Sequence, residues 1–344
     1  MTTSSLWYTR CPVPTASGIA QHKRWLHGAF EEVGVRLDSI RASPDRAVRE
    51  SHFRHGLAGS FREGGNVPPI WARSQGQDTV VVAITWVDEA QLVLVRPDSD
   101  IRSVADLRGR RLGLGLKDGD LVDVLRAESL RGLLTALEIN GVGRDEVDWV
   151  DLPAPEWDLR ERESRERPPR HLLVDAVLTG EVDAVFVKGA GSTRALDDLR
   201  PIFDVNQQQD PMLRISAGSP RPVTVDRTTL ESSPDLVDRY LAVLLRTAEW
   251  ARGNPDDVVA TIAAEIGTSR AAVRRAFGPT LHLAFEPRLD DVVVQALRRQ
   301  KDFLLDEGFL HGDVDVDRWI DPAPLERAHV LAPWIELAAP SLVG

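Results

Sequence analysis

The chain has 344 residues, 42% of them hydrophobic, which is enough to build two lobes or domains with sizeable cores. Aspartate and glutamate outnumber lysine and arginine by 53 to 42, so the formal net charge is −11. An acidic chain of this kind is not expected to bind nucleic acid or an anionic membrane, and an anionic substrate would need a local basic site.

The amino terminus has no uninterrupted apolar core of signal-peptide length. No run of about 18 consecutive apolar residues occurs along the sequence, so no membrane-spanning helix is expected. We therefore expect a cytoplasmic protein.

Cys11, in "YTRCPVP", is the single cysteine of the sequence. It has no partner for an internal disulfide, and a Cys-based zinc cluster is excluded. Pro12 and Pro14 keep this segment out of a helix and favour an extended backbone at Cys11, as at the end of a strand or the rim of a pocket. Two interpretations stay open for Cys11: a small buried hydrophobic residue, or a reactive thiol.

Two further segments of the amino-terminal third carry residues suited to chemistry. "SHF" contains His52, and "FREGGNVPP" contains Arg62 followed by Gly64 and Gly65. Taken singly, the histidine and the arginine are typical of solvated surface side chains, and the glycine pair is typical of a turn. His55 lies one helical turn after His52 and offers a metal pair, but no third ligand with convincing spacing is present.

The middle of the chain alternates short apolar runs with longer amphipathic ones, which indicates an α/β fold. Buried strands are expected at 79–87 and 90–97. The segment "SVADLRGRRLGLGL" (103–116) predicts a short helix ending at Gly109 and then a strand, and a long amphipathic helix is expected over roughly 120–139.

The order helix, glycine, strand recurs in "HLLVDAVLTGEVDAVFV" (171–187). Beyond residue 225, apolar residues spaced three and four apart predict a largely helical region. The glycines of "GLGLKDG" (113–119) lack the spacing of a dinucleotide-binding fingerprint, so no nucleotide site is expected.

Three segments in order, "SVADLRGRRLGLGL", "LTGEVDAVFV" and "QALRRQKDFLLDEGFL", make most of the chain similar to the periplasmic binding proteins for sulfonate, nitrate and taurine. This resemblance implies a two-lobed α/β fold (type II) with a ligand cleft between the lobes. It implies one lobe made of residues 1–98 and 215–344, and a second lobe made of residues 99–214 that closes the cleft.

The amino-terminal segments narrow the resemblance. "YTRCPVP", "SHF" and "FREGGNVPP" resemble the cysteine, histidine and arginine-glycine segments of the bacterial hydroxybiphenyl-sulfinate desulfinases, which act last in dibenzothiophene desulfurisation. By matching positions, the resemblance implies catalytic roles for Cys11 and His52 and substrate binding by Arg62 and Gly65. Gly64, next to Gly65, is expected to take part in substrate binding as well. The resemblance also implies a monomer that cleaves the carbon–sulfur bond of an aromatic sulfinate, as a hydrolase, with no metal or organic cofactor.

These residue types suit an aryl sulfinate, a small anion whose carbon–sulfur bond breaks as a proton reaches the ring carbon. Arg62 offers a planar fork to two sulfinate oxygens, and the neighbouring glycines let the Gly65 N–H come close enough to donate as well. Cys11 either attacks sulfur as a thiolate or donates the proton, and the sequence does not choose between these roles. His52 holds the thiol, tunes it or shuttles a proton to it.

The sequence departs from the desulfinases in two places. Residues 187–190 (Val-Lys-Gly-Ala) replace a tryptophan-rich segment, and the stretch from about 116 to 130 is shorter. The reaction type is therefore better supported than the exact substrate. A solute-binding component of a sulfonate transporter and a cytoplasmic ligand sensor on the same fold are the alternatives, although neither needs a thiol.

Overall fold

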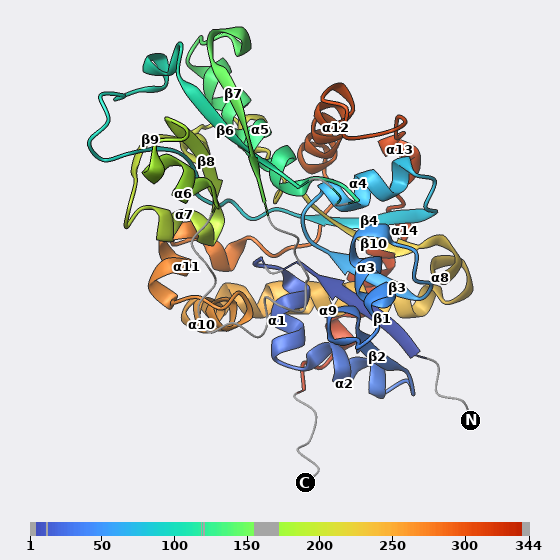
Figure 1. Cartoon of the computed structure of the whole chain (residues 1–344). Helices are drawn as coiled ribbons and strands as arrows, with labels where there is room; N and C mark the ends of the chain where they lie inside the picture. The colour runs from blue at the N-terminus through green and yellow to red at the C-terminus, as the bar shows by residue number, and fades with distance from the viewer. Residues whose placement is uncertain (1–4, 12, 118, 120, 155–171, 339–344) are drawn as a thin grey trace. The chain divides into compact units, whose positions relative to one another are not determined.

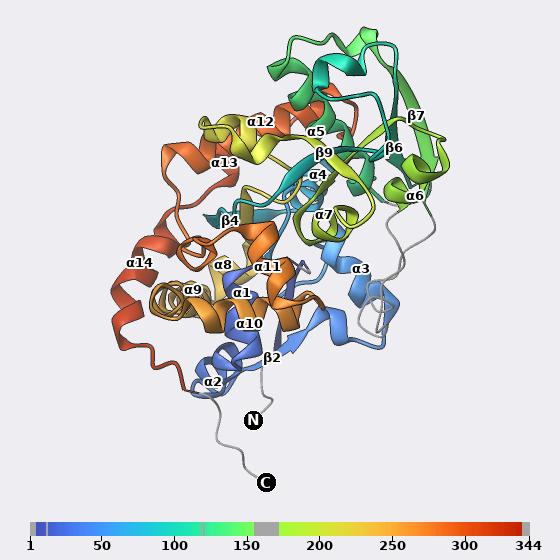
Figure 2. The same cartoon turned by 90° about the vertical axis from the view of Figure 1, so that its left-hand side faces the viewer.

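The computed structural model describes residues 5–11, 13–117, 119, 121–154 and 172–338. Figures 1 and 2 trace the chain in two views 90° apart. The chain forms two compact units: unit 1 comprises Met1–Val87, Gly218–Arg270 and Pro279–Gly344, and unit 2 comprises Asp88–Ala217 and Ala271–Gly278.

Unit 1 is built on a mixed five-stranded sheet of order β2-β1-β3-β10-β4. Strand β1 runs parallel to both of its neighbours, whereas β10 is antiparallel to β3 and β4. The strands are β1 (Ser5–Arg10), β2 (Arg36–Ser39), β3 (Ser60–Glu63), β4 (Thr79–Thr85) and β10 (Arg221–Asp226). The helices are α1 (Ala16–His22), α2 (Trp25–Glu31), α3 (Arg46–Arg54), α4 (Val67–Ser74), α8 (Arg227–Ser232), α9 (Pro234–Gly253), α10 (Pro255–Glu265), α12 (Asp291–Asp306), α13 (Val316–Trp319) and α14 (Ala323–Leu331).

Unit 2 has a second mixed sheet of order β7-β6-β8-β5-β9. Strand β6 is parallel to β7 and β8, and β5 is antiparallel to β8 and β9. The strands are β5 (Gln91–Val95), β6 (Arg111–Leu116), β7 (Asp148–Pro153), β8 (Ala184–Lys188) and β9 (Arg200–Asp204). The helices are α5 (Val124–Ile139), α6 (Leu172–Thr179), α7 (Gly189–Ala195) and α11 (Arg270–Phe277), which enters this unit from Ala271 onward.

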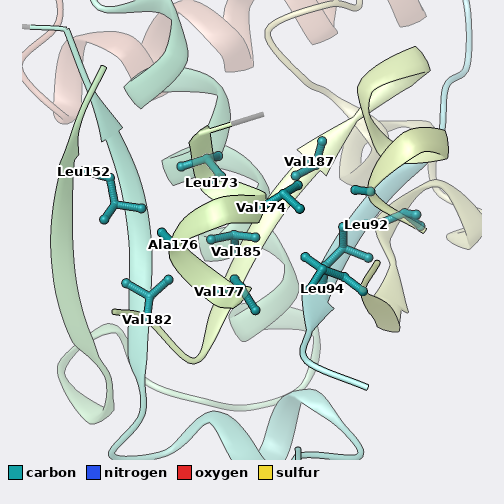
Figure 3. Close-up of a cluster of buried hydrophobic side chains, with 12 residues drawn as sticks. Leu92, Leu94, Leu152, Leu173, Val174, Ala176, Val177, Val182, Val185 and Val187 are labelled. Carbon is teal, nitrogen blue, oxygen red and sulfur yellow. The ribbon is translucent and has the colours of Figure 1, made fainter. Parts of the chain in front are cut away.

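Each unit has its own apolar core. In unit 2, aliphatic side chains of α6 pack against those of β5 and β8, as Figure 3 shows for Val174, Val185 and Leu94. In unit 1, the Phe61 ring of β3 stacks on the Tyr240 ring of α9 with 4.2 Å between ring centroids. Helix α9 of the carboxyl-terminal region therefore packs on the sheet that the amino-terminal third begins.

The structure confirms the elements predicted for the middle of the chain. Strands β4 and β5 consist wholly of buried residues, as expected for continuous apolar runs. A short helical turn precedes Gly109, whose φ of +67° is suited to glycine, and β6 follows it. Helix α5 begins later than expected, because Asp123 caps it by accepting from the Arg126 N–H.

The observed boundaries between the units differ from those expected near residues 98 and 215. Strand β5 was assigned to the first lobe, but it pairs with β8 and β9 and so belongs to unit 2. The segment Ala271–Gly278 also belongs to unit 2. Such pairing is long-range, and no local signal in the sequence announces it.

Among the described residues, no helix is both long enough and apolar enough to cross a membrane.

Candidate active site

Cys11 directly follows β1, which confirms its expected place at the end of a strand. Its N–H donates to the Glu63 carbonyl at 3.2 Å, so the β1–β3 ladder continues to the cysteine. Thr9 lies opposite Arg62 in the register of this ladder. Because side chains alternate along a strand, Thr9 and Cys11 project toward the same face of the sheet.

His52 lies in the last turn of α3 and is buried, with 2% of its surface exposed. Its Nε2 lies 3.6 Å from the Cys11 sulfur, and its Nδ1 lies 2.7 Å from the Thr9 hydroxyl oxygen. Helix α3 begins at a side-chain cap, in which Asp45 accepts from the Ala47 N–H. A short capped helix thus delivers the imidazole to the end of β1.

Arg62 of β3 is equally buried, and its guanidinium contacts three neighbours. Its Nε donates to the His52 carbonyl at 3.2 Å, Nη1 to the Gly65 carbonyl at 3.0 Å, and Nη2 to the Cys11 sulfur at 3.3 Å. These bonds use three of the five N–H donors of the guanidinium. The side chain is held rigidly while each terminal nitrogen keeps a further N–H.

Gly64 lies against the cysteine. A Cβ added at Gly64 would lie 2.8 Å from the Cys11 Cβ, closer than real side chains allow. Glycine is therefore required here because the β3 end passes directly beside the thiol. Gly65 contributes its carbonyl to Arg62, and donation of its N–H to a sulfinate stays a prediction.

The electrostatics of the site favour a neutral imidazole. Burial, reinforced by the positive charge of Arg62, holds the pKa of His52 well below its usual range. Burial also lowers the pKa of Arg62. A neutral imidazole has one nitrogen that donates and one that accepts, so His52 can accept a hydrogen bond from a neighbouring thiol.

His52 and His55, considered above as a metal pair one helical turn apart, do not both lie within a helix, because His55 follows the last residue of α3. His55 caps the end of α3 at a φ of +53°, and its Nδ1 donates to the Phe53 carbonyl at 3.2 Å. Burial lowers the pKa of His55 to about 3. Within the described part of the chain, no group of three or more His, Cys, Asp or Glu side chains is arranged to hold a metal ion.

The sequence reasoning missed two residues that the structure places at this strand end. Thr9 contacts the far side of the His52 ring. Glu63, completely buried, accepts from the Ser17 N–H at 2.7 Å, from the Ala16 N–H at 3.3 Å and from the Thr85 hydroxyl at 2.9 Å. For Thr9 the spacing Thr-x-Cys at the end of a strand was an available signal.

All five candidate residues therefore lie together at the ends of β1, β3 and α3: Cys11, His52, Arg62, Gly64 and Gly65. The departing segment 187–190 lies in unit 2. Its Lys188 ammonium, largely buried, lies 3.1 Å from Glu89 and 3.3 Å from Glu128. A buried, paired positive charge thus lies in the segment where the sequence is expected to depart from the desulfinases that it resembles.

Comparison with curated proteins finds desulfinases. The chain is 30% identical to the 2'-hydroxybiphenyl-2-sulfinate desulfinase of Rhodococcus erythropolis, over 94% of this chain and 93% of that enzyme. The desulfinase of Rhodococcus qingshengii matches with the same identity and coverage. No family model matches the chain.

Comparison with solved structures gives a consistent result. A cysteine-to-serine mutant of the desulfurization enzyme DszB in complex with biphenyl-2-sulfinic acid superposes with a TM-score of 0.75 at 27% identity, over 95% of this chain and 99% of that chain. The periplasmic aliphatic sulphonate binding protein SsuA of Escherichia coli superposes with a TM-score of 0.65 at 17% identity, over 92% of this chain and 97% of that chain. The second likeness confirms the predicted α/β fold of the sulfonate-binding proteins.

Proposed function

Because this chain belongs to the 2'-hydroxybiphenyl-2-sulfinate desulfinase family, we propose that it cleaves the carbon–sulfur bond of an aromatic sulfinate, releasing sulfite and the arene. The observation that carries the proposal is the arrangement around one thiol, with Arg62 and His52 both contacting the Cys11 sulfur. A protein that only binds an anion needs the arginine but has no use for the cysteine and the histidine.

The proposed reaction is a hydrolysis. An aryl sulfinate and one water give the arene and hydrogen sulfite: the carbon–sulfur bond breaks, a proton reaches the ring carbon, and a hydroxyl group reaches sulfur. The net charge of −1 is the same on both sides, and no electrons are gained from or lost to another molecule. The proposal therefore places the enzyme among hydrolases of carbon–sulfur bonds and assigns it no cofactor.

The side chains divide the work by their chemistry. Nη1 and Nη2 of Arg62 each use one N–H group in a contact with the protein. The second N–H group of each nitrogen would bind the sulfinate oxygens. Cys11 would act on the reacting atoms, either as nucleophile toward sulfur or as proton donor toward carbon. The neutral His52 would exchange a proton with the thiol through Nε2.

The decisive experiment measures sulfite release from aryl sulfinates by the purified protein and by its Cys11→Ser variant. We expect release by the wild type, with or without a chelator, and at least about a hundredfold less by the variant, because a hydroxyl is far less acidic than a thiol. Alkylation of Cys11, the one cysteine of the chain, should abolish release, and bound sulfinate should slow the alkylation. Full activity of Cys11→Ser would refute a catalytic role.

The substrate range is tested with a series of aryl sulfinates, the corresponding sulfonates being the controls. Because the sequence is expected to depart from the desulfinases at residues 187–190, we expect a changed preference among aryl groups, since one lost stacking partner is worth about 0.5–1.5 kcal/mol. Hydroxybiphenyl sulfinate should react, and smaller aryl sulfinates should react comparatively better than it does. If no sulfinate reacted while a sulfonate bound tightly and unchanged, the protein would be a binding protein.

The monomeric state and the cytoplasmic location expected from the sequence stay predictions.

A further inference from the structure

We propose that Thr9 is a positioning residue, whose hydroxyl holds the His52 ring in the orientation that turns Nε2 toward the Cys11 sulfur. The contact that carries this inference is the 2.7 Å hydrogen bond between the Thr9 Oγ1 and the His52 Nδ1. Both side chains are 2% exposed, so water is not at hand to replace the bond. The inference deepens the proposed function, because it names how the histidine of that site is kept in place.

The orientation of the ring matters because an imidazole can turn over about its Cβ–Cγ bond. A half-turn exchanges Nε2 with Cε1, and a carbon would then face the sulfur in place of a nitrogen. Arg62 holds the backbone carbonyl of His52 at 3.2 Å and leaves the ring free to turn. The Thr9 hydroxyl forms a hydrogen bond with a ring nitrogen and not with a ring carbon. It therefore selects the ring orientation in which Nδ1 faces Thr9 and Nε2 faces the sulfur.

A hydroxyl also suits the proton step better than a carboxylate would. When Cys11 is a thiol, its proton points to Nε2, Nδ1 carries the ring hydrogen, and Thr9 accepts from it. When the proton moves from sulfur to Nε2, the sulfur–hydrogen bond breaks, a nitrogen–hydrogen bond forms, and the Nδ1–H bond to Thr9 persists. When the ring instead carries its single hydrogen on Nε2, the hydroxyl rotates and donates to Nδ1. Thr9 thus serves every protonation state of His52 without adding a negative charge to the site.

The strand geometry explains why this position holds the partner. Thr9 precedes Cys11 by two residues and faces Arg62 in the parallel ladder, so the three side chains share one face of the sheet. One rigid strand end therefore presents both the thiol and the group that orients its histidine.

The test compares Thr9→Val, which keeps the shape and loses the hydroxyl, with Thr9→Ser, which keeps the hydroxyl. Thr247→Val is the matched control, because Thr247 is also fully buried and donates to the Val243 carbonyl within α9. Two quantities are measured: the alkylation rate of Cys11 by iodoacetamide at pH 7 without substrate, and kcat and KM for sulfite release.

We expect Thr9→Val to lower both the alkylation rate and kcat by about tenfold to a hundredfold with KM within about threefold of the wild type. Thr9→Ser should recover most of the loss, and Thr247→Val should behave as the wild type. Wild-type alkylation and kcat in a folded Thr9→Val variant would overturn the proposal. Should Thr9→Val fail to fold by circular dichroism, Thr9→Ala takes its place with the same two outcomes.

The alkylation measurement separates this inference from the proposed function. If the wild type released no sulfite from any sulfinate while Thr9→Val still slowed alkylation, the proposed function would fail and the role of Thr9 would stand. If the wild type released sulfite and Thr9→Val changed neither the alkylation rate nor kcat, the proposed function would stand and the role of Thr9 would fail.

Discussion

The Arg62 guanidinium binds the sulfur of Cys11, the carbonyl of His52 and the carbonyl of Gly65 at once, in a fully buried environment. Burying a positive charge is unfavourable unless its donors find acceptors, and here two carbonyl oxygens and one sulfur accept from it. The arginine thus fixes the positions of its neighbours as well as supplying charge, and a lysine has neither the planar shape nor the number of donors to replace it.

Ligand affinity should therefore depend on Arg62 far more than on His52. In a Cys11→Ser background, which blocks turnover, we expect Arg62→Lys to weaken binding of biphenyl-2-sulfinic acid at least about tenfold, because a charge-assisted hydrogen bond is worth about 1.5–3 kcal/mol. His52→Gln should stay within about threefold, since the neutral imidazole supplies no charge. Titration calorimetry measures both.

Arg73→Lys in α4 is the control for this series, because Arg73 forms an ion pair with Asp78 within the same unit. It should bind the ligand as the parent does. Near-parental affinity of Arg62→Lys would show that Arg62 does not clamp the sulfinate.

At the scale of elements, the two faces of the β1–β3 ladder have separate tasks. Thr9, Cys11 and Arg62 belong to the face with the candidate site, whereas Glu63 turns to the other face and caps the start of α1. The Glu63 backbone carbonyl accepts from Cys11, and its side chain accepts from Ala16 and Ser17. One residue therefore holds the connection between β1 and α1 at both ends.

Removing the charge of Glu63 should destabilise the fold measurably. A glutamine would direct an N–H group toward a backbone N–H, so Glu63→Gln should lower the free energy of unfolding by about 1–3 kcal/mol. The control is Glu50→Gln, since Glu50 forms an exposed ion pair with Arg46 one turn away on α3, and such pairs contribute about 0.3–0.5 kcal/mol. Urea unfolding distinguishes the two, and equal losses would contradict the capping role.

The sequence identified the elements whose signal is local. Strands β4 and β5 were predictable because a strand buried on both faces consists of a continuous apolar run. The turn before β6 was predictable because its positive φ favours a glycine. Strands β2 and β3 have four residues each with exposed or functional side chains, and such segments carry little periodicity. The place of β10 between β3 and β4 depends on residues far apart in sequence.

The candidate site was predictable to the extent that family resemblance marks its residues. Cys11, His52 and Arg62 were named from motifs, and their mutual contacts then followed from the structure. Glu63 was missed because a glutamate after an arginine is ordinary in any sequence. Thr9 was missed because the spacing Thr-x-Cys indicates a shared face only once both residues are assigned to one strand. His52, the partner of Thr9, lies 43 residues later in the chain, and Ser17, a partner of Glu63, lies 46 residues earlier. Only the fold brings these residues together.

At the scale of the whole molecule, two buried neutral histidines make stability depend on pH. The unfolded chain takes up a proton on His55 below about pH 6.5, whereas the folded protein does so only near pH 3. Between these values the unfolded state binds more protons, so the free energy of unfolding falls as pH falls, by up to about 1.4 kcal/mol per pH unit for each such group. Above about pH 6.5 this stability is fully present.

The contribution of His55 can be isolated by His55→Asn. Asparagine tolerates the positive φ of +53° at the end of α3 and does not titrate. Between pH 7 and pH 5 the wild type should lose about 1–2 kcal/mol more stability than the variant, as urea titrations at the two pH values would reveal. Equal losses would mean that His55 protonates as readily in the folded protein as in the unfolded chain.

Strand β10 also sets an order of events during protein synthesis. It lies between β3 and β4, yet it is made only after the whole segment Asp88–Ala217 of unit 2. The edge of β3 that will pair with β10 therefore emerges from the ribosome unpaired and stays so while most of unit 2 is translated, for seconds at ordinary rates of about 5–20 residues per second. Cys11 is therefore synthesised well before β10, and the sheet beside it is completed only after unit 2 has been made.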